Sequence, residues 1–388
     1  MTNQPIDLRG SQGAIIGATG PISQHYSGYS AEQVSALIAQ IKRVDQPSTW
    51  DGRRPYVGLA AFQERDAAFF FGRERLVGEL LGRLQSAAFV CVAGPSGSGK
   101  SSLVQAGLIH ALRQGTLVGS DRWLIERMTP QGSPLEQLAR CISALALSAG
   151  KPSSVGDELR SRAPGDPLAL HDLVDLLTRS AGAPRALLYV DQFEELFTQT
   201  HNEQERSTFL AQLTGAVQVQ AGELSVVISL RSDFLSQCAT YPALRELISQ
   251  QFQLVGALSA EELVRAITLP ALEVGVQVDP ELVAQLIDDM KGEPGSLPLM
   301  QFALKDLFDA QQAKKGDAVR LTLDEYLERG GVQQALERHA NQVFGQFDAQ
   351  QQQLVRIVFS RLIEVGRGTL DTRRIAAFSD LTPAGVDS

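Results

Sequence analysis

Five short runs of nearly uninterrupted apolar residues are the most regular feature of the chain. They are Phe89–Ala93, Trp123–Met128, Ala186–Val190, Leu224–Leu230 and Phe252–Val255. Stretches with helical spacing of apolar residues separate these runs, and strands of this kind are typical of a parallel sheet that is covered on both faces. The pattern therefore predicts an α/β fold, a three-layer sandwich around a central parallel sheet.

The pattern becomes helical after Gly256. Ser259 and Glu262 form the sequence signature of a capping box, and Pro280 suits the first position of a helix. Three further stretches keep the helical spacing: Leu297–Phe308, Val332–Phe344 and Gln351–Val365. Gly366–Leu370 then indicates a tight turn that enters a short wing. An all-helical region is therefore expected to follow the sheet.

The N-terminal part of the chain has a different character. Residues 1–29 are rich in Gly, Ser, Gln and Thr, and are predicted to be either a flexible leader or, around Ile15–Ile16, a short self-assembly motif. Ser30 begins a capping box ahead of an amphipathic helix whose apolar stripe includes Val34. That helix either docks on the main domain or pairs with another copy, because it is too short to be stable alone. Residues 45–54 read as a linker.

Composition narrows the classes of protein that remain. The chain has 388 residues, 44% of them hydrophobic, and its formal net charge is −9. No long Lys/Arg cluster is present, which disfavours nucleic acid as a partner. The three scattered cysteines, Cys91, Cys141 and Cys238, indicate reduced thiols. The N-terminus has no secretory signal and no apolar run is long enough to cross a bilayer, so a cytoplasmic protein without membrane contact is expected.

A glycine-rich loop stands between the first predicted strand and a helix-forming stretch. The loop consists of Gly94, Pro95, Ser96, Gly97, Ser98, Gly99 and Lys100. The helix-forming stretch after it begins with Ser101 and Ser102. A glycine-rich segment can fit such a pattern by chance, but strand, loop and helix in this order are the context of a phosphate-binding P-loop. Lys100 would reach the β- and γ-phosphates of ATP or ADP, and the Ser101 hydroxyl would hold Mg²⁺. The motif predicts nucleotide binding.

Asp191 directly follows the third predicted strand, where parallel sheets bind ligands. The alternative is an ordinary turn aspartate, but beside a P-loop Asp191 is expected to hold Mg²⁺ together with Ser101. Hydrolytic P-loop enzymes usually place the water-polarising Glu next, and here Gln192 stands instead. The general base is therefore sought at Glu194 or Glu195, with helical geometry slightly favouring Glu194. A displaced base predicts slow hydrolysis.

Arg231 ends the strand Leu224–Leu230. It is predicted either to contact the γ-phosphate or to form a surface salt bridge with Asp233.

Together these strings resemble the STAND class of P-loop NTPases, and most closely its bacterial branch called novel STAND type 1. The resemblance covers about residues 55–378. The strings that carry it are Pro55–Leu59, Phe71–Glu74, the P-loop, Asp191–Phe197, Leu230–Phe234 and Pro294–Leu299.

The resemblance implies roles that the residues alone leave open. Arg73 would lie by the adenine and ribose, its alternative being a surface arginine. Pro298 would pack against adenine from a helical lid, its alternative being a helix-breaking loop proline. A closing winged-helix domain would clamp ADP in the resting state. Family members normally continue into a sensor array, so the end at Ser388 predicts either a fragment or a different means of sensing.

The expected domains are a leader (1–29), a helix with linker (30–54), a P-loop NTPase domain (55–257), a helical lid (258–331) and a winged-helix-like domain (332–388). The function predicted is a slow ATPase switch that exchanges ADP for ATP-Mg²⁺ and self-associates as a homo-oligomer. Its N-terminal segment would recruit an effector, at the family level in antiviral defence or regulated cell death. The alternatives are a constitutive AAA-type ATPase motor and a scaffold that holds nucleotide without turnover.

Overall fold

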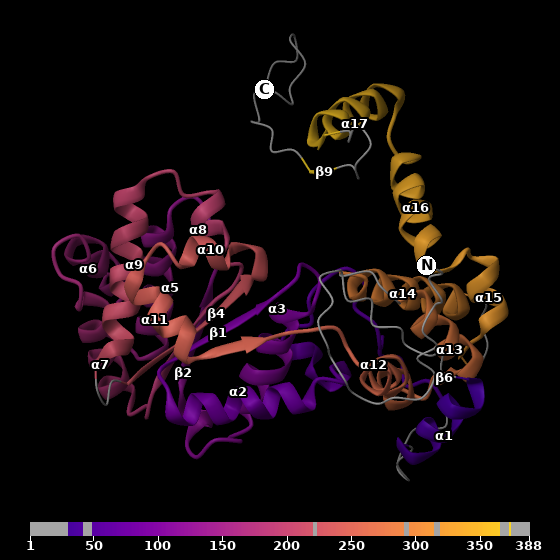
Figure 1. The fold of residues 1–388 in the computed structure, drawn as a ribbon, viewed down its shortest axis with the longest axis horizontal. Coiled ribbons are helices and arrows are strands. Elements are labelled where there is room, and N and C mark those ends of the chain that lie inside the picture. The colour runs from indigo at the N-terminus through magenta and orange to yellow at the C-terminus, as the bar shows by residue number, and fades with distance from the viewer. Residues whose placement is uncertain are drawn as a thin grey trace, which may run out of the picture.

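A five-stranded parallel sheet forms the centre of the computed structural model, which describes residues 30–41, 49–219, 223–290, 295–313, 319–364 and 372–373 (Figure 1). The strand order is β2-β3-β4-β1-β5, and every neighbouring pair is parallel. The strands are β1 (Phe89–Gly94), β2 (Leu124–Met128), β3 (Ala186–Val190), β4 (Leu224–Arg231) and β5 (Phe252–Leu254). The predicted α/β sandwich with its parallel sheet is therefore confirmed.

Two layers of helices cover the two faces of this sheet. Alternate side chains of β1 separate the layers, because Cys91 packs into one hydrophobic cluster and Val92 into the other. On the Val92 side lie α2 (Glu74–Ser86) and a continuous helix made of α3 (Lys100–Ser102), the π-helical η2 (Leu103–Ile109) and α4 (His110–Arg113). On the Cys91 side lie α5 (Pro134–Ser148), α6 (Val155–Arg162), α7 (Ala169–Ala181), α9 (Glu203–Gln218) and α11 (Pro242–Gln250).

Short elements connect these layers. They are the 3-10 helices η1 (Glu64–Phe69), η3 (Ser120–Arg122) and η4 (Ser232–Phe234), with the one-turn helices α8 (Glu195–Thr198) and α10 (Leu235–Cys238). We call residues 55–257 the sheet domain.

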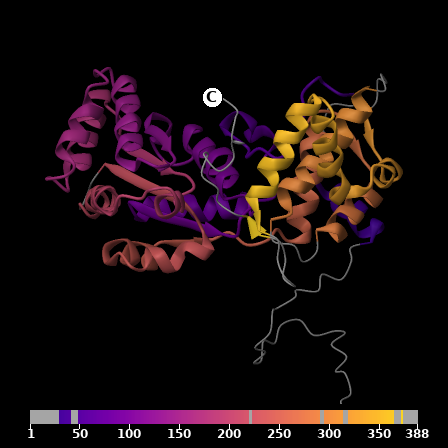
Figure 2. The ribbon, with the colours of Figure 1, turned by 90° about the horizontal axis from the view of Figure 1, so that it is seen from above.

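A second body of helices, which we call the lid, follows β5. It contains α12 (Ala260–Glu273), α13 (Pro280–Asp289), α14 (Leu297–Ala313) and α15 (Leu323–Glu328), with a parallel pair of short strands, β6 (Gln277–Val278) and β7 (Arg320–Leu321). The predicted capping box at Ser259 and the proline at the start of α13 are both present. Figure 2 shows the sheet domain and the lid side by side along the long axis.

The N-terminal helix α1 (Ala31–Ile41) docks on the lid. Ser30 and Gln33 make the predicted reciprocal capping bonds. Val34 is fully buried among the apolar side chains of α12 and α13, and Leu37 and Ile38 pack beside it. Of the two arrangements expected for this helix, the structure therefore has the intramolecular one.

Beyond the lid, α16 (Gly331–Phe344) leads away from the body of the molecule to α17 (Ala349–Leu362) (Figure 1). The helix predicted to reach Val365 ends at Leu362, because Ile363 has extended backbone and begins β8 (Ile363–Glu364). This strand pairs antiparallel with β9 (Thr372–Arg373). The turn at Gly366–Leu370 and most of the C-terminal segment lie outside the described residues, so the winged-helix assignment of 332–388 stays a prediction. The leader 1–29 also lies outside the described residues, as do residues 42–48, which include the first part of the predicted linker 45–54.

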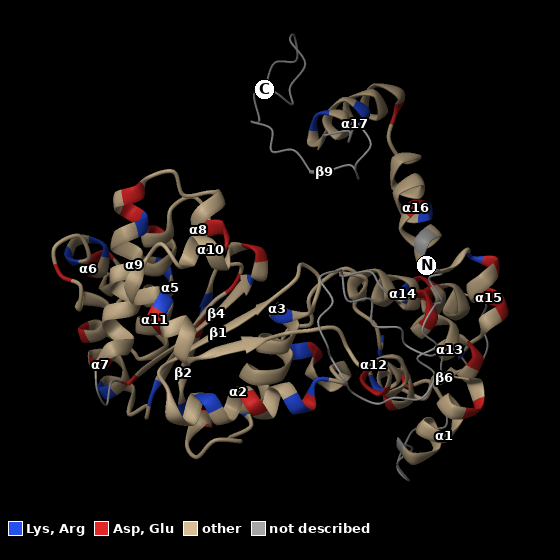
Figure 3. Cartoon of the chain, viewed as in Figure 1, with Lys and Arg blue, Asp and Glu red and all other residues tan. Residues whose placement is uncertain are grey.

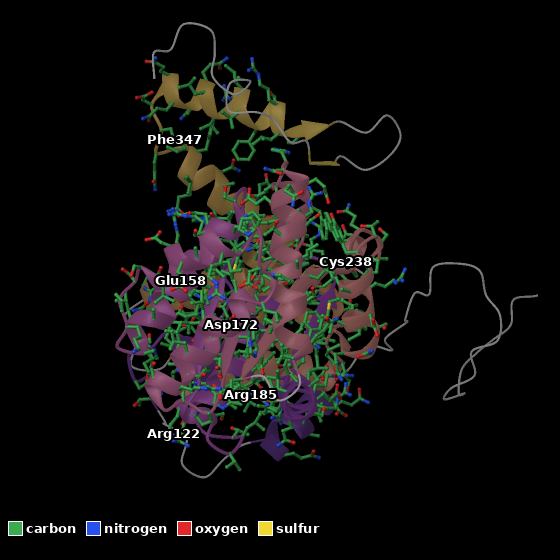
Figure 4. The ribbon with its side chains drawn as sticks, turned by 90° about the vertical axis from the view of Figure 1, so that its left-hand side faces the viewer. Arg122, Glu158, Asp172, Arg185, Cys238 and Phe347 are labelled. Carbon is green, nitrogen blue, oxygen red and sulfur yellow. The ribbon has the colours of Figure 1, made fainter. Side chains whose placement is uncertain are left out.

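The charges seen in Figure 3 are mixed in sign along the helices. At the outer end of the sheet domain, where Figure 4 labels Glu158 and Asp172, both carboxylates pair with Arg162. The side chain of Cys238 is buried in the same domain. Among the described residues, no helix has the length and apolar character that crossing a membrane requires.

Candidate nucleotide-binding site

The P-loop lies where β1 meets α3. Gly97 and Gly99 have positive φ values of 72° and 88°, which turn the loop around an open centre. The helix that begins at Lys100 points its N-terminus at this centre. The Ser98 hydroxyl is buried and has no hydrogen-bond partner among the described residues. A buried, unpaired hydroxyl next to the N-terminus of a helix suits the oxygens of a phosphate.

Lys100 is held inside its own loop. Its ammonium Nζ donates to the carbonyl oxygens of Gly94 at 2.9 Å and Pro95 at 2.8 Å, and only 9% of the residue is exposed. Burial lowers the pKa of Lys100, while the carboxylates of Glu194 and Asp191 oppose that shift. The cation is thus already positioned at the loop, paired with backbone oxygens.

The Asp191 carboxylate gathers donors from three elements. Its Oδ1 accepts from the Ser101 hydroxyl at 2.9 Å, from the Gln192 amide at 3.0 Å and from the Ser229 hydroxyl on β4. Carboxylate and hydroxyl oxygens suit Mg²⁺. The buried hydroxyl of Tyr189, two residues before Asp191 on β3, has no partner among the described residues. Ser101 and Asp191 are therefore a fitting pair for the metal.

The two candidate bases point to different neighbours. Gln192, with an unusual φ of 50°, turns the chain sharply after β3. Glu194 accepts from the backbone amide of Arg231 at 3.2 Å and is the carboxylate with the strongest influence on Lys100. Burial raises the pKa of Glu195, and the charges of Glu194 and Asp191 add to that effect. One oxygen of Glu195, Oε2, is buried without a partner among the described residues. Glu194 therefore belongs to the phosphate end of the site more directly than Glu195.

Arg231 makes the salt bridge that was one of its two predicted roles. Its Nη2 and Nε donate to the two carboxylate oxygens of Asp233 at 2.7 Å and 3.1 Å, and its guanidinium lies 5.6 Å from the Phe234 ring centre. The guanidinium is 30% exposed at the tip of β4. A contact with the γ-phosphate would require Arg231 to leave Asp233.

Arg73 is buried, with 6% of the residue exposed. Its Nη2 donates to the carbonyl oxygen of Ser98 at 3.3 Å and to that of Gly256 at 2.7 Å. Its Nη1 lies 3.8 Å from a carboxylate oxygen of Glu262 on the lid helix α12. The surface alternative is therefore wrong. Arg73 instead joins the P-loop, the connection between the domains and the lid.

The residues beside Arg73 also contact α12. A Cβ atom on Gly72 would lie 2.4 Å from the carbonyl oxygen of Glu262, so only glycine permits this approach of the two backbones. Glu74 accepts from Arg265 of α12 at 3.0 Å. The Gly-Arg-Glu string thus forms one side of the joint between sheet domain and lid.

The P-loop itself touches the lid at a pair of glycines. A Cβ atom on Gly97 would lie 2.7 Å from the Cα of Gly295, and Gly295 has a φ of 94°. Pro298 follows at the start of α14 and lines the same space.

The resulting pocket, about 200 Å³ in volume, has walls from both domains. The sheet domain supplies Arg73, the P-loop residues Gly97–Ser102 and the segments 58–62 and 69–71, and the lid supplies Leu258, Ala266, Leu297, Pro298, Met300 and Gln301. Of the predicted residues, Arg73, Gly97, Ser98, Gly99, Lys100, Ser101, Ser102 and Pro298 therefore line one cavity.

Sequence reasoning did not identify Gln301. Its spacing of three residues from Pro298 puts both on one face of α14, and this spacing is the sequence signal that points to it. Ser229 was also missed, because the order of the strands decides that it approaches Asp191. Tyr189 was missed as well, although alternation along β3 puts it on the same side as Asp191.

The chain matches the family model described as novel STAND NTPase 1 over residues 55–387. No curated protein matches it. Among solved structures, the ORC2 protein of Aeropyrum pernix with ADPNP and ADP has a TM-score of 0.46 and 17% identity, with 81% of this chain and 78% of that chain covered. The Walker-type ATPase of Pyrococcus abyssi has a TM-score of 0.45 and 14% identity, with 78% and 79% covered. Drosophila ORC bound to DNA has a TM-score of 0.43 and 16% identity, with 90% and 77% covered. These similarities are weak and carry no conclusion about function.

Proposed function

This chain belongs to the novel STAND NTPase 1 family, and from that premise we propose that it is an ATP-binding switch that hydrolyses ATP slowly. The observation that carries the proposal is the pocket between the two domains. Its phosphate end is the P-loop of the sheet domain, and its opposite wall is the lid helix α14. A ligand that touches both domains can bias their relative placement, provided that ADP and ATP make different contacts.

Binding at the phosphate end requires internal bonds to change. Lys100 would exchange the carbonyl oxygens of Gly94 and Pro95 for phosphate oxygens. Ser101 would release Asp191, and Arg231 would release Asp233 if it contacts the γ-phosphate. These exchanges connect nucleotide binding with rearrangement at the tips of β1, β3 and β4.

The same residues support slow hydrolysis. Ser101 and Asp191 would hold Mg²⁺, which neutralises phosphate charge when it is bound. Glu194, held by the Arg231 amide, would orient water and accept its proton. Gln192 occupies the position directly after Asp191 and carries no base, so the proton acceptor comes from a residue further along the turn. Because the base is displaced, we expect the slow ATP hydrolysis of a switch and not the fast turnover of a motor.

We assign Arg73 and Pro298 to the nucleoside side of the pocket, with Gly94–Ser102 around the phosphates. In the resting state ADP would hold the lid against the sheet domain. Exchange for ATP would release the lid and α1 with it, since α1 is docked there. The N-terminal segments would then assemble copies of the chain into a homo-oligomer that recruits an effector. The setting would be the bacterial cytoplasm, in antiviral defence or regulated cell death.

Turnover and exchange measured on the purified chain test this proposal. We expect bound ADP that exchanges slowly and hydrolysis well below about one turnover per second without a trigger. Untriggered turnover of several per second would instead identify a constitutive motor. Retained ADP with neither exchange nor hydrolysis would identify a scaffold. Asp191→Ala should abolish the Mg²⁺ dependence of ATP binding, and Asp175→Ala on the outer helix α7 serves as the matched control.

A further inference from the structure

Gln301 lines the pocket and carries a buried polar atom that has no partner among the described residues. The residue is 9% exposed and belongs to the pocket wall on α14. Its side-chain oxygen Oε1 is buried and has no hydrogen-bond partner among the described residues. Buried acceptors in native structures are normally paired, so an unpaired one on a residue that lines a binding pocket points to a donor on the ligand.

The position of Gln301 along α14 indicates which part of a nucleotide it meets. Leu297, at the start of the helix, lies 4.0 Å from the Cβ position of Gly99 in the P-loop. Gln301 follows one turn later, about 6 Å further along the helix axis. Phe302 and Lys305, on the following turn, approach Gly58, which also lines the pocket. Gln301 therefore stands beyond the phosphate end, where the base lies when the phosphates occupy the P-loop.

The surroundings of Gln301 suit a purine ring. Leu258, Ala266 and Met300 line the same cavity with apolar surface. An acceptor in such a wall selects a ring that carries a donor at its edge. Adenine has its exocyclic 6-amine there, whereas guanine has an oxygen at the same position.

We propose that Gln301 is the residue by which the lid recognises adenine, with Oε1 accepting a hydrogen bond from the 6-amine. This inference rests on the proposed function, because it assumes that the pocket holds ATP or ADP. It makes the lid, and not only the P-loop, responsible for the choice of nucleotide. It also gives α14 a contact that is lost when the lid moves away from the base.

The contact is tested by removing the 6-amine from the ligand and, separately, the side-chain amide from Gln301. The full chain is titrated with ATP, with purine riboside 5′-triphosphate, which lacks the 6-amine, and with 2′-deoxy-ATP. The wild-type protein should bind ATP about 10-fold more tightly than purine riboside triphosphate, which is about 1.4 kcal/mol. In Gln301→Leu this ratio should fall to about one, while the ratio of ATP to 2′-deoxy-ATP stays as in the wild type. Gln285→Leu, on the neighbouring helix α13, should keep the wild-type ratios.

The outcomes separate the inference from the proposed function. Equal affinity of the wild-type protein for ATP and purine riboside triphosphate would overturn the inference without any variant. An equal loss of both nucleotides in Gln301→Leu would mean a structural role, and loss of the 2′-deoxy preference would mean a ribose contact. Either result contradicts adenine recognition by Gln301 but leaves the switch proposal intact. A wild-type chain that binds none of the three nucleotides would overturn both.

Discussion

The sheet domain and the lid collect their hydrophobic cores from the chain in different ways. The two clusters that cover the sheet come from one continuous stretch, from Leu76 to Val255. The cluster of the lid combines Leu258 and later residues with Val34, Trp50 and Tyr56, which precede every strand of the sheet in the sequence. These three residues therefore pack against the lid, although all five strands stand between them and the lid helices in the sequence.

This difference has a mechanical consequence. The two bodies meet at the Gly-Arg-Glu string, at the pair Gly97 and Gly295, and around the nucleotide pocket. Any movement of the lid relative to the sheet would carry α1 with it. A nucleotide that bridges the pocket can thus influence the N-terminal segment without touching it.

The largest effect should come from a change on the sheet side of the pocket. Lys100→Ala removes the ammonium at the P-loop, and because several charge-assisted hydrogen bonds are lost, nucleotide affinity should fall about 1000-fold. Calorimetric titration measures this loss. The free energy of unfolding of the lid should not change, since Lys100 donates its hydrogen bonds to Gly94 and Pro95 of its own loop. Lys151→Ala, outside the pocket in the same domain, is the control. Equal nucleotide affinities of Lys100→Ala and this control would contradict phosphate binding by the P-loop.

The rate of ATP hydrolysis should depend on residues of the sheet domain alone. Glu194→Gln should slow hydrolysis about 100-fold and leave ATP affinity nearly unchanged, because it removes a base and keeps the side-chain volume. Glu195→Gln should slow hydrolysis much less, since it is Glu194 that accepts from the Arg231 amide and opposes the lowering of the pKa of Lys100. Single-turnover assays compare the two variants. A larger loss of hydrolysis rate in Glu195→Gln than in Glu194→Gln would identify Glu195 as the general base.

A change in α1 should affect the lid alone. Val34 is fully buried in the lid core, and Val34→Ala should destabilise the lid by about 2 kcal/mol through lost burial and a cavity. Hydrogen exchange should then quicken in α12 and α13 but not in β1 and β4. Ala36→Ser, on the exposed side of the same helix, should have little effect. Faster exchange in the sheet strands would show that α1 supports the sheet domain as well.

A smaller effect is expected at the contact between the bodies. Gly295→Ala puts a methyl group 3.0 Å from the carbonyl oxygen of Ser96, at a φ of 94°. The lid should be pushed from the P-loop, and ADP affinity should fall about 10-fold, which corresponds to about 1.4 kcal/mol. Gly52→Ala has nearly the same φ of 93° with nothing within 4 Å, so it reproduces the backbone strain without the clash. ADP titration of both variants separates the two effects. Equal ADP affinities of the two variants would contradict a contact between the lid and the P-loop that supports ADP binding.

Much of the sheet domain could be predicted from local pattern. The run Ala186–Val190 is β3 residue for residue, and Asp191 emerges at its end beside Ser101. The P-loop and its two glycines with positive φ follow from sequence because the requirement is local. Strand order is not local, and it is strand order that brings Ser229 to Asp191.

The lid was harder to anticipate. Its helices follow from spacing and caps, but periodicity does not say which body a helix covers, and α1 had two possible partners. For Arg231 the sequence leaves two roles open, a contact with the γ-phosphate and a salt bridge with Asp233. The sequence alone does not place either partner relative to the guanidinium. Gln301 looks like an ordinary helical polar residue until its neighbours show that Oε1 is unpaired.

The central claim is that the nucleotide sets the placement of the lid relative to the sheet domain. The three native cysteines are buried, so a fluorophore pair can be attached at Leu147→Cys on α5 and Glu281→Cys on α13, both exposed positions. Energy transfer between them is measured with ADP and with a non-hydrolysable ATP analogue plus Mg²⁺. The account predicts two different distance distributions, and no difference when Lys100→Ala is added. Identical distributions in the two nucleotides, with both shown to be bound, would contradict it.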